Sequence, residues 1–454
     1  MTFGGSIRSR VENWGWFTPN TGDPSYTYDG STIRFGLSQS RARFAWTVEF
    51  EAPVLLHLPS HSVAPGNQGQ LGQGAGYFVA NKNRSNVAMV FPKQAFLRWK
   101  LHGSDLASLR VGRFEFQDGS EVPAKDPSLG VLKRDRIQQR LIGPFGFTHV
   151  MRSFDGFHYS NTKPKINYTL IGAVPTRGVF QTDGWGWLKA AFAYGSVTGQ
   201  VQRKSTSGEW RLFVVYYHDW RPIPKADNRP APARTMDLAN IRIGSYGGHY
   251  VQVTQTPIGA VDAIGAFVVQ TGKWGVLNHR AGMFDVEAGF QPKILKQLKP
   301  WIRGGYTYGS GDSDPNDRRH GTFFQMLPTA RPYAQFPFYD MLNNVDRFGM
   351  LALRPHARVT LKTEMHWLRL ANKNDLWYLG GGAFQPWTFG YQSRSGGGAG
   401  SLADLVSAGM DFTVNPHFSV SPYYGHATGK SAIEAVYPRG PNGHLAFLEA
   451  NYRF

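Results

Sequence analysis

RVTLKTEMHWL, residues 358–368, alternates between two kinds of side chain along its whole length. One face is mainly apolar and carries Val359, Leu361, Thr363, Met365 and Trp367. The other face is polar and carries Arg358, Thr360, Lys362, Glu364 and His366. Because successive side chains of a β-strand point to opposite sides, this period of two predicts a strand. The ionisable residues of the polar face predict that this face contacts water.

The same alternation recurs at Ala95–Leu101 and at Ala446–Phe454, and shorter versions occur between them. Short turns separate some of these segments, and long connections near 52–92, 117–149, 221–238 and 309–344 separate others. Short turns alternating with long loops are typical of outer-membrane barrels, in which an apolar outer face surrounds a polar lumen. We therefore expect an all-β fold, a single transmembrane antiparallel β-barrel domain over 1–454. At roughly 25 residues per strand and connection, it would have about 18 strands, with short periplasmic turns and long extracellular loops.

Composition agrees with this interpretation. The chain has 49 Lys and Arg against 31 Asp and Glu, a net charge of +18, and no cysteine, which excludes disulfides and thiolate chemistry. No apolar run of about 18 residues exists to form a transmembrane helix. Several expected strands begin or end in Trp or Tyr, and the chain ends in Phe454, as in barrels inserted into the outer membrane. The opening MTFGGSIRSR has no apolar centre, so we expect that a signal peptide has been removed from an outer-membrane protein.

Basic side chains dominate the candidate pore positions. Alternation places Arg98, Lys100, Arg358 and Lys362 in the lumen, and further arginines lie in or beside the long connections: Arg140, Arg152, Arg318, Arg319, Arg331, Arg347 and Arg354. Guanidinium groups in a narrow pore favour anions, and their planar fork suits carboxylates. An alternative remains open, in which many of these arginines form ladders with lumen carboxylates such as Asp155 and Glu364. Arg113 falls on the apolar side of its segment, so either a bulge at Gly112 turns it inward or it lies above the membrane.

Catalytic and cofactor sites are not expected. No nucleophile-elbow or P-loop motif is present, so we predict neither enzyme activity nor a cofactor. Asp312, Asp314 and Asp317 have a spacing that could hold calcium, but they lack the glycine and the final glutamate of an EF-hand loop. Solvated turn carboxylates are the preferred interpretation, and no metal is predicted.

Three motifs stand out, GRFEFQDG (112–119), RLIGPFGFTHVMRSFDGFHY (140–159) and GSGDSDPNDRRHGTFFQMLPTARPYAQFPFYDMLNNVDRFG (309–349), which together comprise 69 of the 454 residues. They resemble the alginate export family of outer-membrane proteins. The positions that match are Arg113, Glu115, Arg140, Arg152, Asp155, Asp312, Asp314, Asp317, Phe323 and Gln325. The resemblance implies an 18-stranded barrel with an arginine-lined constriction through which a polyuronate leaves the cell, and loops that plug or gate the pore.

The function expected from these observations is an anion-selective outer-membrane channel for an alginate-like polyuronate or a related anionic solute. One alternative is a passive uptake porin for small anions or oligosaccharides. Another is a soluble basic β-module that binds acidic polymers. The expected partners are the anionic solute, outer-membrane lipid and lipopolysaccharide. Periplasmic export or plug proteins are a further class of partner compatible with the sequence, and nucleic acid is not expected. We expect a monomeric barrel, and we expect the loop 309–344 to fold into or over the pore.

Overall fold

The computed structural model describes the whole chain except residues 328–334, 381–382 and 390–392. It contains one sheet of 20 strands, in which 18 long strands form the wall and the short β4 and β15 pair with the ends of β3 and β13. The wall strands are β1 (Thr2–Gly15), β2 (Ser25–Ser40), β3 (Phe44–Leu56), β5 (Phe91–Lys100), β6 (Ala107–Phe114), β7 (Phe154–Thr162), β8 (Ile166–Pro175), β9 (Ala190–Gln202), β10 (Thr206–Asp219), β11 (Ile241–Gln255), β12 (Gly259–Trp274), β13 (Leu277–Pro292), β14 (Trp301–Gly309), β16 (Asn344–His356), β17 (Val359–Leu370), β20 (Ser401–Asn415), β21 (Phe418–Gly429) and β22 (Asn442–Arg453).

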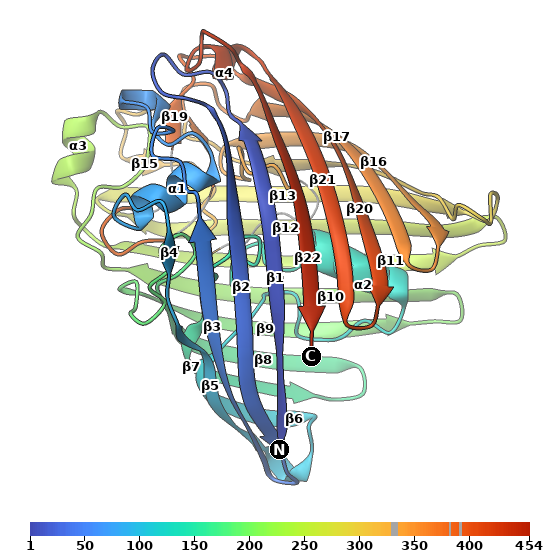
Figure 1. Cartoon of the computed structure of the whole chain (residues 1–454). Helices are drawn as coiled ribbons and strands as arrows, with labels where there is room; N and C mark the ends of the chain where they lie inside the picture. The colour runs from blue at the N-terminus through green and yellow to red at the C-terminus, as the bar shows by residue number, and fades with distance from the viewer. Residues whose placement is uncertain (328–334, 381–382, 390–392) are drawn as a thin grey trace.

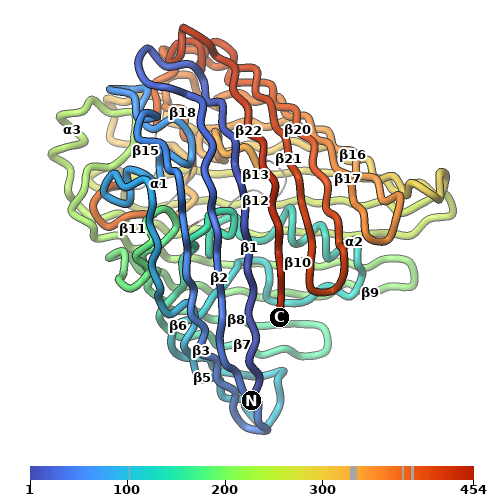
Figure 2. The backbone as a smooth tube through the Cα atoms, viewed as in Figure 1, coloured from blue at the N-terminus to red at the C-terminus, as the bar shows by residue number. Residues whose placement is uncertain are grey.

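The sheet closes on itself because β1 pairs with both β2 and β22, always antiparallel. Closure leaves no unpaired edge strand, which is a condition for a sheet to cross a membrane. The fold is thus the expected 18-stranded antiparallel barrel. Figure 1 and Figure 2 show both termini at one end of this barrel, and Figure 1 shows the helices α1, α3 and α4 at the other.

The two faces of the wall differ as the alternation predicts. On β17, Leu361, Met365 and Trp367 are 37%, 37% and 43% exposed on the outer face, whereas Glu364 and His366 are 3% and 0% exposed on the inner face. The outer faces of β10 to β14 carry a similar band of exposed Leu, Val, Ile and aromatic side chains. This band is the surface that lipid would cover.

The connections are short at one end and long at the other. Turns 41–43, 101–106, 163–165, 203–205, 256–258, 293–300, 357–358 and 416–417 form the short-turn end. At the opposite, long-loop end the longest connections are 57–90, 115–153, 310–343 and 371–400. The last of these is a long loop that the sequence analysis did not identify. Loops contain α1 (Gln73–Ala80), α2 (Pro127–Leu132), α3 (Ala231–Met236), α4 (Ser431–Glu434), the 3-10 turn η1 (Gly66–Gln68), the π-turn η3 (Lys133–Ile137), and the short strands β4 (Val87–Ala88), β15 (Arg319–His320), β18 (Leu376–Tyr378) and β19 (Ser393–Ser395); the 3-10 turn η2 (Leu101–Gly103) is in a short turn.

Within the described part of the chain, no helix is both long and apolar enough to cross a membrane.

Candidate solute passage

The loop 115–153 folds into the barrel. The side chain of Asp126 caps α2 by accepting from the backbone N–H of Leu129 at 2.9 Å, and Pro127 occupies the first turn, where its missing N–H costs nothing. Leu129 and Leu132 of α2 then pack against Val251 and other apolar side chains of the inner wall. Burial of this apolar face holds the helix inside the lumen rather than in solvent.

Ion pairs fasten the same loop to the inner wall. Arg136 donates to Glu287 of β13 at 2.6 Å, and both groups are almost fully buried. Lys133 pairs with Glu209 of β10, and Arg140 pairs with Asp285 of β13. Truncating one partner of such a buried pair is strongly destabilising because it leaves an uncompensated charge. The loop is therefore a fixed part of the lumen.

The loop 310–343 also folds inward, as expected, and meets the loop 115–153. Leu327 N–H donates to the carbonyl of Leu141 at 2.9 Å, and Gly143 N–H donates to the carbonyl of Leu327 at 2.7 Å. The Gln325 amide donates to the carbonyl of Arg140 at 2.7 Å. These bonds join the two loops into one internal constriction.

A buried carboxylate, Asp375, ties the loop 310–343 to the loop 371–400. It accepts from Asp312 N–H at 2.9 Å and from the Thr322 hydroxyl at 2.6 Å through one oxygen. The other oxygen accepts from Leu376 N–H at 2.7 Å and from the Tyr378 hydroxyl at 2.9 Å. Burial raises the pKa of Asp375 to about 6, although these four donors act in the opposite direction. We call this cluster the Asp375 latch.

Most arginines of the inner wall are paired with carboxylates. Arg34 contacts Glu115 at 2.8 Å and Glu51 at 2.9 Å. Arg303 bridges Asp262 and Glu287 at 2.8 and 2.7 Å. Similar pairs join Arg10 to Glu12 and Arg211 to Asp118 and Glu121. The ladder alternative left open by the sequence therefore accounts for most of the lumen arginines, and Arg10, Arg34, Arg211 and Arg303 were not identified from the sequence.

Two arginines of the inner wall that line cavities, Arg110 and Arg354, differ from the paired arginines. Neither has a carboxylate within ion-pair distance among the residues that the structure describes. Arg110 stands on β6 between Arg98 of β5 and His158 of β7 in the strand register, and it donates to Nδ1 of His158 at 2.7 Å. Its guanidinium lies over the ring of Phe114 at 4.4 Å. This Arg98–Arg110–His158 row contributes Arg110 and His158 to a lumen cavity of about 330 Å³.

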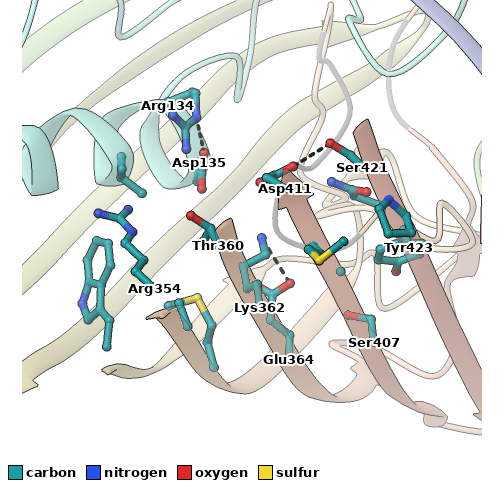
Figure 3. A pocket seen from close by; sticks show the side chains of 18 of the residues that line it. Arg134, Asp135, Arg354, Thr360, Lys362, Glu364, Ser407, Asp411, Ser421 and Tyr423 are labelled. Atoms are coloured by element: carbon teal, nitrogen blue, oxygen red, sulfur yellow. Dashed lines mark hydrogen bonds and ion pairs between the residues drawn. The ribbon is translucent and has the colours of Figure 1, made fainter. Parts of the chain in front are cut away.

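Arg354 lines a larger cavity of about 390 Å³ between η3 and the strands β14 to β22. Figure 3 shows the cavity walls, on which Lys362 pairs with Glu364 at 3.4 Å and Arg134 pairs with Asp135 at 2.6 Å. Asp411 accepts from the Ser421 hydroxyl at 2.8 Å. Since the other two bases are paired here, Arg354 is the guanidinium of this cavity that is available to an incoming carboxylate.

The remaining predicted site residues are dispersed. Arg98 and Lys100 lie at the short-turn end of β5, where Asp105 pairs with them at 3.3 and 3.2 Å. Arg358 is exposed in a short turn, not in the lumen, and donates to the carbonyl of Val414 at 3.2 Å. Arg318 and Arg319 are exposed at the long-loop end, and Arg331 is outside the described residues.

Arg113, Asp155 and Arg347 lie on the outer face, which corrects their assignment to the pore. Arg113 Nε donates to Asp155 at 2.7 Å, and the Trp187 indole N–H donates to the same carboxylate at 2.6 Å. Gly112 has a φ of 122°, but the register of β5 and β6 runs without a shift, so no bulge turns Arg113 inward. Arg347 lies beside the ring of Tyr306, 5.8 Å from its centroid.

Arg152 is fully buried where loops meet. Its guanidinium donates to the carbonyl of Ala383 at 3.2 Å and lies 5.8 and 5.7 Å from the ring centroids of Phe145 and Phe384. A side chain in this position holds the loop junction together. It is not at the wall of either large cavity.

The calcium candidates bind backbone groups of their own loop. Asp312 accepts from the N–H groups of Asp314 and Gly321 at 3.1 and 3.0 Å. Asp314 and Asp317 each accept from the N–H two residues later, at 2.9 and 2.6 Å. Among the described residues, no group of three or more His, Cys, Asp or Glu side chains has the arrangement of a metal site. The three carboxylates act as turn caps.

Comparison with known proteins gives one family and one architecture. The family model for alginate export matches residues 67–435. The outer-membrane protein OpdK from Pseudomonas aeruginosa is similar in structure over 100% of this chain and 99% of its own, with a TM-score of 0.58 and 7% identity. OpdK with vanillate and OccK9 (OpdG), from the same species, cover 100% of this chain and 98% and 97% of their own, with TM-scores of 0.59 and 0.60 and 8% identity each. No curated protein sequence matches significantly.

Proposed function

We propose, because this chain belongs to the alginate export family, that it is a channel of the bacterial outer membrane conducting small acidic saccharides and related carboxylates. Transport by such a channel has no chemical step. The observation that carries the proposal is that Arg110 and Arg354 each line a lumen cavity and have no carboxylate partner among the described residues. A permeating carboxylate supplies the missing partner.

Binding at these two arginines has to be transient for conduction. A site must be favourable enough for a solute to enter and weak enough for it to leave. Arg110 is held by Phe114 and His158, so its fork is already oriented beside the cavity. A guanidinium–carboxylate contact that solvent can reach is weak, about 1 kcal/mol or less. The contact therefore favours anionic solutes and still allows them to leave the site.

A short oligomer or single acidic sugar fits the lumen better than a long polymer. The loops 115–153 and 310–343 cross the interior and are fixed there by buried ion pairs and backbone hydrogen bonds. The spaces beside them are separate cavities of about 390 and 330 Å³. The OpdK structure with vanillate pairs the same architecture with a small carboxylate. The polyuronate of the family's description would need these loops to open.

Reversal potentials in planar bilayers test the proposal. At about 6 Å in a water-like medium one charge changes the energy of a monovalent ion by roughly 0.7 kcal/mol, which is about threefold in partitioning. The double variant Arg110→Gln, Arg354→Gln should therefore lower the chloride-to-potassium permeability ratio several-fold. Arg347→Gln is the outer-face control, since it removes one guanidinium charge that does not face the lumen. Cation selectivity of the wild-type channel would overturn the proposal.

A further inference from the structure

The short turns carry a disproportionate share of the positive charge. The eight turns of the short-turn end comprise 30 residues, with ten Lys and Arg and one acid, Asp105, so their net charge is +9, half of the chain's +18. The connections at the long-loop end are far longer but hold 21 Lys and Arg against 15 Asp and Glu, a net charge of +6. Charge at the two mouths of the barrel is therefore asymmetric.

The ten bases form a collar. Turns 41–43, 163–165 and 203–205 carry two each, turn 293–300 carries three, and turn 357–358 carries one. All ten side chains are exposed, and among the described residues none forms an ion pair with a carboxylate. Asp105 is already engaged by Arg98 and Lys100 of β5. The short-turn collar, defined as these ten side chains, is thus an uncompensated positive ring around one mouth.

The collar continues into the lumen. Arg98 and Lys100 lie just inside the mouth on β5, and Arg110 is the register partner of Arg98 on β6. Beyond them lies the cavity of about 330 Å³. Lipid headgroups at the rim could reach the turns, but they could not follow a row of bases along the inner wall. This continuity favours a solute that enters the pore as the occupant of the collar.

We infer that the short-turn collar captures acidic oligosaccharides at the periplasmic mouth and passes them along Arg98 and Arg110 into the lumen. The inference rests on the proposed function and adds a direction to it, because short turns are periplasmic in these barrels. A mouth lined by one sign of charge raises the association rate of an opposite charge by about 10- to 1,000-fold, and salt suppresses the effect. Capture is accordingly faster from the periplasmic side.

Two variants of the full-length channel test this inference. The collar variant carries Lys163→Gln, Lys165→Gln, Arg203→Gln and Lys204→Gln, which removes four exposed charges from two turns. The matched control carries Lys82→Gln, Arg84→Gln, Arg318→Gln and Arg319→Gln, which removes four exposed charges from the long-loop end. The measurement is the association rate of current block by hexagalacturonate added to either side of a planar bilayer, with maltohexaose as the neutral probe.

We expect faster block from one side in the wild type. We take a 100-fold enhancement of the association rate by the nine net charges of the short-turn end, and a logarithm of this enhancement that is proportional to the net charge. Removing four of the nine charges then lowers the association rate about eightfold, on that side only. The control variant should keep this fast side, and block by maltohexaose should be unaffected. Symmetric block, or an equal effect of the two variants, would overturn the inference while leaving the reversal potentials, and hence the proposed function, intact. Loss of binding to anionic phospholipid vesicles with unchanged block would assign the collar to lipid and also overturn it.

Discussion

Replacing Asp375 with Asn should loosen the Asp375 latch. The carboxylate receives two hydrogen bonds at each oxygen, and the amide keeps only one oxygen. If the amide nitrogen replaces the oxygen facing Asp312 and Thr322, the Thr322 hydroxyl can rotate to accept, but the Asp312 N–H loses its acceptor. Leaving a buried N–H without an acceptor costs about 1–3 kcal/mol, so at pH 5, where Asp375 is mostly protonated, the free energy of local opening should fall by about 2 kcal/mol. The open population should rise about 30-fold.

Hydrogen exchange followed by mass spectrometry measures this opening directly. At pH 5, peptides covering 311–323 and 374–379 should exchange about 30-fold faster in the variant, while strands of the wall keep their protection. Asp317→Asn is the control, because it is the same substitution in the same loop at an exposed carboxylate with one local hydrogen bond. Equal acceleration in both variants, or none in Asp375→Asn, would show that Asp375 does not hold the two loops together.

Two further predictions concern the same loops. Burial raises the pKa of Asp375 from its ordinary 3.8 to about 6, so the closed latch binds the proton of Asp375 more tightly than the open latch does. The stability of the latch is therefore greatest below pH 3.8, falls as the pH rises to about 6 and is constant above that pH. After correction for intrinsic exchange, latch peptides should open more at pH 7 than at pH 5, and Asp375→Asn should abolish this difference. Arg152→Glu should lower the thermal unfolding temperature, because it places a carboxylate in a fully buried loop junction. Arg152→Met should lower the unfolding temperature less. Equal unfolding midpoints for the two variants in a heat-dependent gel-shift assay would contradict the buried position of Arg152.

The barrel could be predicted from alternation wherever outer-face residues are apolar. It could not be predicted for β1 and β2, because their outer faces mix polar side chains with apolar ones such as Ile7 and Phe35. Ser9 and Ser31 bond to each other across the two strands at 3.0 Å, and Asn13 donates to Thr27 at 2.9 Å. Each polar group is satisfied by its cross-strand neighbour, so it can face outward at a reduced cost. A pattern read along one strand does not contain this pairing.

The site was less predictable than the fold because alternation gives the face of a residue but not its partner. Lys362 and Arg110 both face the lumen, yet Lys362 is paired with Glu364 whereas Arg110 has His158 beside it. Many partners depend on the register between strands, as for Arg113 and Asp155 on the outer face. The loop that enters the lumen, 115–153, is fixed by carboxylates more than 70 residues away, such as Glu209 and Glu287. These long-range contacts leave no local signal.

The acids of the inner wall explain how a chain of this charge can fill its own lumen with loops. A basic loop entering a basic pore would be repelled, but Glu287 and Asp285 receive Arg136 and Arg140, and Glu209 receives Lys133. The paired charges neutralise each other and stabilise the position of the loop. The charge that acts on a solute is then the remainder, which includes Arg110, Arg354 and the short-turn collar. Selectivity in such a barrel therefore follows from where carboxylates are missing more than from the number of arginines.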